Sequence, residues 1–149
     1  FYIKGVTQSV ARVLEAVDDE RVKVASKLRC KNVVTAIEWL SMAYNVTEDN
    51  LLDAIHSNPG YVGIMAPRTT NVRYITEDVP MSLVPIAEFG KAIDIKTRVI
   101  DSLIDLANSI FKKDFRQSGR NLSKLGLDNL SLQDMRNTLI EGINKRDAI

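Results

Sequence analysis

Cysteine and histidine each occur only once in this chain of 149 residues. The single Cys30 cannot form an internal disulfide, so a reduced, cytoplasmic setting is expected. The single His56 means that no histidine-rich metal cluster or catalytic triad can be built from this chain alone. We therefore expect both to be structural, Cys30 as a small packed apolar side chain and His56 as an imidazole near a helix end.

Strong net charge and long apolar runs are also missing. The formal net charge is +1, so neither a nucleic-acid surface nor a trap for acidic partners is indicated. No apolar run is long enough to cross a bilayer and no signal-peptide pattern is present, so no membrane association is expected. With 45% hydrophobic and 26% charged residues, the composition is that of a soluble globular protein. The length favours a single domain over residues 1–149.

The alternating pattern of strands is absent, and the apolar residues follow helical spacing almost throughout. This pattern predicts an all-α, compact multi-helix domain. The longest helix is expected from about Thr7 to Arg29. Its apolar face would contain Val10, Val13, Leu14, Val17, Val24, Ala25 and Leu28.

Capping signals place further helices along the chain. Thr35 with Glu38 forms a capping box before a helix whose Trp39 is expected in the core. Thr47 is expected to cap a short third helix. Ser131 with Asp134 would start the final helix. Two more helices are expected at 83–91 and 96–111, and the final helix would bury Met135, Leu139 and Ile143.

The only extended irregular segment covers residues 56–71, with the sequence HSNPGYVGIMAPRTTN. Long ordered loops in compact domains are often functional, so this loop is a candidate part of a site. Its Gly60-Tyr61-Val62-Gly63 run is not a dinucleotide-binding fingerprint, because it lacks the preceding strand, the following helix and the third glycine.

The segment Arg73-Tyr74-Ile75-Thr76-Glu77-Asp78-Val79-Pro80 has the highest density of groups suited to catalysis. An Arg fork can hold a substrate carboxylate, and an Asp can orient a histidine supplied from elsewhere. The alternative is a local ion pair or a carboxylate at a helix start. A short helix is expected here, and Pro80 and Pro85 are expected to prevent a continuous helix across 79–84.

These residues resemble a known family. The motif R-Y-x-x-E-D-V at 73–79 and the motif D-F-R-x-x-G-R-x-L-x-x-L-G-L at 114–127 are similar to the C-terminal helical domain of opine dehydrogenases, the octopine/nopaline dehydrogenase-like enzymes. Asn58-Pro59-Gly60-Tyr61 agrees as well, and the similarity covers nearly the whole chain. The resemblance implies a fold like the C-terminal domain of 6-phosphogluconate dehydrogenase-like enzymes.

The resemblance also implies an activity, namely the reductive joining of an amino acid to a 2-oxo acid with NAD or NADP. The cofactor would be bound mainly by an N-terminal Rossmann domain that this chain lacks, in agreement with a start at Phe1 rather than Met. By the match at R-x-x-x-x-D, Asp78 would pair with a catalytic histidine upstream and Arg73 would grip a substrate carboxylate. Asn58 and Tyr61 would contact substrate, and a homodimer would be in keeping with the family.

Two other functions stay open at this point. One is a domain of a related 2-hydroxy-acid dehydrogenase, and the other is a non-catalytic helical protein-interaction module. An interaction module has no need for Arg73 and Asp78 to converge beneath a long loop. The sequence does not distinguish NAD from NADP, nor one amino acid or oxo acid from another.

Overall fold

The computed structural model describes residues 1–141, and every regular element in that range is helical, as predicted. No helix among them is long and apolar enough to cross a membrane. In chain order the elements are α1 (Tyr2–Gly5), α2 (Gln8–Lys27), α3 (Ala36–Tyr44), α4 (Leu51–Ser57), the 3₁₀ turn η1 (Pro59–Tyr61), α5 (Arg73–Thr76), the π-turn η2 (Val79–Leu83), α6 (Val84–Ala92), α7 (Arg98–Phe111), α8 (Phe115–Ser118) and α9 (Leu132–Glu141).

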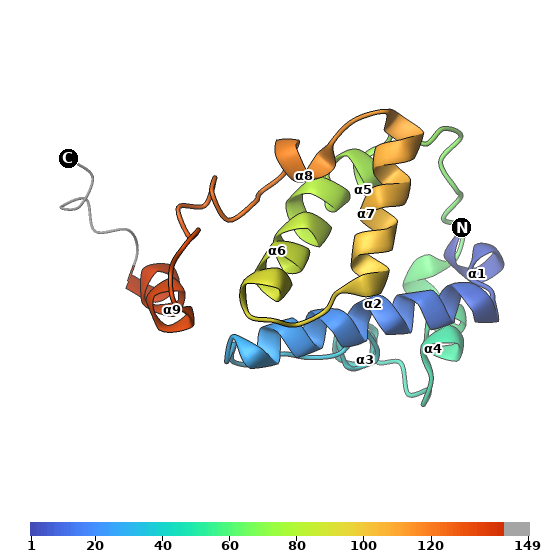
Figure 1. Cartoon of the computed structure of the whole chain (residues 1–149). Coiled ribbons are helices and arrows are strands. Elements are labelled where there is room, and N and C mark those ends of the chain that lie inside the picture. The colour runs from blue at the N-terminus through green and yellow to red at the C-terminus, as the bar shows by residue number, and fades with distance from the viewer. Residues whose placement is uncertain (142–149) are drawn as a thin grey trace.

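The long helix α2 runs through the middle of the fold. Helices α6 and α7 pack on one side of it, and α3 and α4 lie on the other (Figure 1). Two apolar cores correspond to these two sides. One is built around Leu40 and Ile55, and the other around Ile100 and Ile104. A smaller third cluster, which contains Leu127 and Met135, connects α9 to the segment that follows α8.

Helix α2 begins where the sequence predicts, because the Thr7 side chain accepts the Val10 N–H. The predicted burial of its first half is wrong. Val10, Val13 and Leu14 are each about two-fifths exposed, whereas Ala11 beside them is fully buried in the first core. Helical spacing identifies an apolar face, but it does not reveal which stretch of that face another element covers.

Helix α3 begins with the predicted capping box. The Glu38 N–H donates to Thr35 Oγ1, and the Thr35 N–H donates back to Glu38 Oε2 at 2.7 Å. The prediction for Trp39 is wrong, because its side chain is 49% exposed rather than in the core. Leu40, on the adjacent face of the helix, is buried instead.

This capping box gives a stability prediction. The hydrogen bonds from Thr35 lower the pKa of the exposed Glu38 carboxyl below its usual value. The stabilisation is therefore complete above the pKa of the unfolded state, and it is lost as the pH falls through the folded value. Removing the cap with Thr35→Ala should cost about 1 kcal/mol in unfolding free energy at neutral pH. The cost should shrink in acid, and a cost independent of pH in urea unfolding would contradict this coupling.

Several short elements differ from the sequence prediction. Helix α4 is capped by Asn50, whose Oδ1 accepts the Asp53 N–H at 3.0 Å, and not by Thr47. The elements α1, η1 and α8 were not predicted, because three or four residues are too few to show a period. Cys30 is exposed rather than packed.

The two prolines that follow Asp78 do not interrupt the helical path in the expected way. Residues 79–83 form a π-turn, and its bond from the Val84 N–H to the Val79 carbonyl leads directly into α6. A π-turn takes one more residue per turn than an α-helix, so it can accommodate Pro80 and Pro85 where α-geometry could not. The chain is therefore helical across the stretch where we expected a break.

The last helices agree with the prediction in most respects. Helix α7 is capped from a distant element, since the Glu20 carboxylate of α2 accepts the N–H groups of Val99 and Ile100, both at 2.9 Å. Helix α9 begins after Ser131, whose hydroxyl accepts the Asp134 N–H as predicted. Its Met135 is buried, but Leu139 is 59% exposed, which contradicts the predicted buried face. Ile143 lies outside the described residues.

Candidate functional site

The segment from Arg73 to Asp78 lies where α5 meets the π-turn. Arg73 is the first residue of α5, and its side chain is 84% exposed. Its Nε donates to Glu77 Oε2 at 2.8 Å, and its Nη2 donates to Oε1 at 3.3 Å. Arg73 thus pairs with Glu77, whereas the local ion pair that the sequence left open was one for Arg73 and Asp78.

The pairing leaves part of the Arg73 guanidinium accessible. Glu77 takes the edge formed by Nε and Nη2, and an exposed i,i+4 pair of this kind contributes little to stability. The guanidinium has five N–H donors and Glu77 uses two of them. The outer end of this fork of donors can therefore still bind a second carboxylate.

Asp78 is held at the start of the π-turn by the residues that follow it. Its own side chain is exposed, whereas Val79 and Pro80 are buried directly after it. Val79 belongs to the core cluster that includes Phe115 of α8. A carboxylate that faces solvent on a backbone anchored in the core is suited to meeting a group from outside the chain.

All four tyrosines of the chain gather beside this segment, together with Phe1 and the only tryptophan. Neighbouring rings in this aromatic row lie 4.2 to 6.4 Å apart between centroids. The order of the rings is Tyr74, Phe1, Tyr2, Tyr61, Tyr44 and Trp39.

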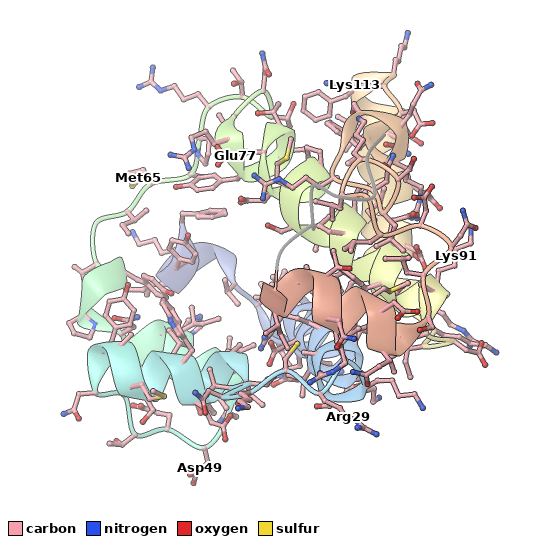
Figure 2. The ribbon with its side chains drawn as sticks, turned by 90° about the vertical axis from the view of Figure 1, so that its left-hand side faces the viewer. Arg29, Asp49, Met65, Glu77, Lys91 and Lys113 are labelled. Atoms are coloured by element: carbon pink, nitrogen blue, oxygen red, sulfur yellow. The ribbon has the colours of Figure 1, made fainter. Side chains whose placement is uncertain are left out.

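The row connects parts of the chain that are far apart in sequence. In Figure 2 the loop through Met65 runs from the region of α3 up to the segment that contains Glu77. Tyr74 belongs to the upper end of that loop, and Tyr61 lies at its lower end. No spacing rule connects these positions, so sequence reasoning could not have found the row.

Asp78 acts electrostatically on the middle of this row. Burial raises the pKa of Tyr2, and the charges of Tyr74, Tyr44 and Asp78 add to the increase. Burial likewise raises the pKa of Tyr61, with Tyr44 and Tyr2 as further causes. Burial is thus the main cause at both rings, and Tyr2 stacks on Tyr61 with 4.2 Å between the ring centroids.

Asn58 is placed differently from an ordinary contact residue. Its side chain is fully buried, and its Oδ1 accepts the Gly60 N–H at 2.9 Å, which caps the 3₁₀ turn. Its Nδ2 has no hydrogen-bond partner among residues 1–141. A Cβ at Gly60 would lie 2.8 Å from the Tyr44 ring, so any larger residue there would have to displace that ring. The Asn-Pro-Gly-Tyr sequence thus builds the turn that positions Tyr61.

An apolar groove of about 310 Å³ opens beside the row, between α2 and α3. Leu14, Val17 and Trp39 form much of its wall, and Tyr2 and Tyr61 border it. The only carboxylate in the lining is Asp18. Its Oδ1 accepts two hydrogen bonds from Arg21, and its Oδ2 accepts the Ala36 N–H at 2.7 Å.

The described part of the chain offers no metal site and no dinucleotide site. No group of three His, Cys, Asp or Glu side chains converges within residues 1–141. His56 Nε2 lies 2.8 Å from the Val6 carbonyl oxygen, which is a structural contact. Gly60 and Gly63 follow a helix and a 3₁₀ turn, so they lack the strand that a pyrophosphate-binding turn needs.

Comparison with known sequences matches residues 1–111 to the family described as NAD/NADP octopine/nopaline dehydrogenase, alpha-helical domain. An opine dehydrogenase from Arthrobacter sp. (strain 1C) is 38% identical over 93% of the chain. The protein ocs of Agrobacterium tumefaciens (strain Ach5) is 30% identical over 86% of the chain. The chain spans 38% and 35% of these two relatives' lengths.

Two solved structures of octopine dehydrogenase share the fold. The complex with NADH and L-arginine superposes with a TM-score of 0.68 at 22% identity, over 97% of this chain and 41% of that one. The complex with NADH and agmatine gives 0.69 at 21% identity, over 95% of this chain and 41% of that one. The helical architecture predicted from the sequence is confirmed by this agreement.

Proposed function

The chain belongs to the octopine/nopaline dehydrogenase family, and on this premise we propose that it is the substrate-side domain of an opine dehydrogenase-like oxidoreductase. The reaction condenses the amine of an amino acid with the carbonyl of a 2-oxo acid and releases water. Hydride from NADH or NADPH then reduces the imine carbon, and a proton on nitrogen completes the secondary amine.

The nicotinamide cofactor supplies the hydride, and a Rossmann domain outside this chain would bind it. This assignment is supported by the lack of a dinucleotide turn in residues 1–141 and by relatives that are more than twice as long. A homodimer and a cytoplasmic location, the latter expected from the single free Cys30, belong to the same proposal.

Asp78 would receive the imidazole of a histidine from the preceding domain. A carboxylate beside an imidazole favours its protonated form and selects its tautomer. The histidine could then polarise the substrate carbonyl and later take back the proton. The single observation that carries this role is the position of the Asp78 carboxylate, which is exposed while Val79 and Pro80 of the π-turn directly after it are buried.

Arg73 would hold one substrate carboxylate with the outer end of its fork. Glu77 supports this role because it occupies the opposite edge of the guanidinium and so limits its rotation. Tyr61 and the rings on either side of it would form one wall of the substrate site. Asn58 would contribute through its buried amide, which carries an unused donor.

We propose further that the apolar groove receives the side chain of the amino acid. Because the Asp18 carboxylate is ion-paired with Arg21 and also accepts the Ala36 N–H, its charge is already compensated and attracts a guanidinium or ammonium group only weakly. An uncharged aliphatic side chain would therefore bind better than that of arginine or lysine.

The groove can be tested with Leu14→Glu in the full-length protein. A new carboxylate in the wall should lower kcat/KM for leucine relative to arginine by about 10-fold or more, measured with one 2-oxo acid. The matched control is Val13→Glu, which adds the same charge at a similarly exposed position in the same turn of α2, outside the groove lining. An equal change in both variants would remove the groove from the proposal.

The proposed function itself is tested by nicotinamide oxidation with the full-length protein. Oxidation should require both an amino acid and a 2-oxo acid, and mass spectrometry should detect the secondary amine. Oxidation with a 2-oxo acid alone would indicate the 2-hydroxy-acid dehydrogenase alternative. No oxidation with any pair, together with a stable protein partner, would favour the interaction module.

A further inference from the structure

The second sequence motif, at 114–127, contains no residue with a role in the proposed reaction, yet it touches the turn that carries Asp78. We infer that Gly119 and Arg120 of this motif form a positioning element for Asp78. The inference rests on the proposed function for its catalytic meaning, but its structural content can be tested independently.

The Pro80 carbonyl has no hydrogen-bond donor within its own helix. In the π-turn the Val84 N–H is taken by the Val79 carbonyl. The donor that would serve the Pro80 carbonyl in the same register is residue 85, which is a proline without an N–H. The Pro80 carbonyl must therefore find a donor outside the helix, because an unpaired buried carbonyl is costly.

The donor to this carbonyl lies in the segment that follows α8. The backbone N–H of Arg120 donates to the Pro80 oxygen at 2.9 Å. This bond spans forty residues of sequence and ties the π-turn to the end of α8. Pro80 follows Asp78 by two residues, so this hydrogen bond restrains the backbone close to Asp78.

Residue 119 is a glycine because there is no room for a side chain at this position. A Cβ at Gly119 would lie 2.5 Å from the Pro80 oxygen, 2.7 Å from the Phe115 oxygen and 3.0 Å from the Pro80 Cα. All three are backbone atoms, so no side-chain rotation can relieve the contact. The φ of Gly119 is −78°, which alanine adopts readily. Space alone, and not backbone conformation, therefore demands glycine here.

Gly119 and α8, which precede the donor Arg120, are held in place by hydrogen bonds of their own. The Gly119 N–H donates to the Phe115 oxygen at 2.8 Å, and the Phe115 N–H donates to Asn108 Oδ1 of α7 at 2.9 Å. Phe115 is almost fully buried in the cluster that contains Val79. A larger residue at 119 should therefore push Pro80, and with it the turn that carries Asp78, away from the end of α8.

Gly119→Ala in the full-length protein tests the inference, and Gly90→Ala is its matched control. Gly90 is also buried, but the atoms nearest to a Cβ there, beginning with the Ile95 oxygen at 2.9 Å, belong to Ile95, Thr97 and Val24 and not to the π-turn. Both variants should be less stable. Only Gly119→Ala should move Pro80 away from residue 119 in a crystal structure.

The pH dependence of kcat should report whether Asp78 has moved, because its carboxylate raises the pKa of the histidine. Moving the carboxylate away from the histidine lowers the histidine pKa, so the alkaline limb of kcat for imine reduction should shift to lower pH. We expect kcat to fall by about 10- to 100-fold, as for a displacement of roughly 1 Å. Gly90→Ala should leave the alkaline limb in place.

A second variant avoids the steric clash in case Gly119→Ala fails to fold. Pro85→Ala restores an N–H that can compete with Arg120 for the Pro80 carbonyl, and it introduces a better helix former. It should shift the alkaline limb in the same direction by a smaller amount without loss of stability.

The positioning role of Gly119 and the proposed function fail on different outcomes. An unchanged alkaline limb in both Gly119→Ala and Pro85→Ala overturns the positioning role, as does a crystal structure in which Pro80 stays in place. If the wild-type protein forms no opine, the proposed function fails, and the position of Pro80 in the variant crystals still decides whether Gly119 controls the Asp78 turn.

Discussion

Asp78→Asn should lower kcat of the full-length enzyme by about 10²- to 10⁴-fold, the range typical of lost general acid–base assistance. The amide keeps the size of the side chain but removes the negative charge that favours a protonated imidazole. Because the Asp78 side chain is exposed and makes no hydrogen bond among the described residues, stability should change by less than about 0.5 kcal/mol.

The measurement is steady-state nicotinamide oxidation with both substrates saturating, alongside thermal unfolding. Asp49→Asn is the control, since Asp49 is also exposed and lies at the far end of the molecule from Glu77 in Figure 2. A rate for Asp78→Asn within a few-fold of wild type would remove Asp78 from the proposed mechanism.

Arg73→Lys should raise KM for a carboxylate substrate by about 10- to 100-fold, since a charge-assisted bidentate pair is reduced to a single point contact. The positive charge is retained, so the loss measures fork geometry rather than charge. Lysine also cannot bind Glu77 through two parallel bonds, as Arg73 does. KM should rise by a larger factor than kcat falls, because the arginine holds the substrate both before and during reduction.

Varying the 2-oxo acid and the amino acid in turn identifies the carboxylate that Arg73 holds. Arg98→Lys is the control for an exposed arginine on another helix. Saturation curves for both substrates that match the wild type would show that the Arg73–Glu77 pair is only a surface ion pair.

The parts of the fold that were predicted correctly depend on contacts within one or two helical turns. The capping box of Thr35 with Glu38 and the cap that Ser131 gives to the Asp134 N–H each lie within four residues, so the sequence displays them. The same is true of the apolar period of α7, which the prediction placed within two residues of its observed start.

The errors share a different origin. Trp39 and Leu14 lie on apolar helical faces, but whether a face is covered depends on elements distant in sequence. The π-turn was not predicted because two prolines normally end a helix, and the compensating bond from Arg120 to Pro80 comes from another part of the chain.

The candidate site shows the same division. The two motifs at 73–79 and 114–127 could be recognised as a pair, but nothing in their letters indicated that Gly119 touches Pro80. The tyrosines at 2, 44, 61 and 74 follow no period, and only folding brings their rings together.

Local hydrogen bonding and helical period are properties of neighbouring residues, and so the sequence by itself determined the longer helices of this protein and the family to which it is related. The tertiary structure alone decided which apolar faces stay open, how the aromatic row forms and what holds the Asp78 turn. The physical reason is that these features need chain segments tens of residues apart to meet, and that meeting depends on packing over the whole domain.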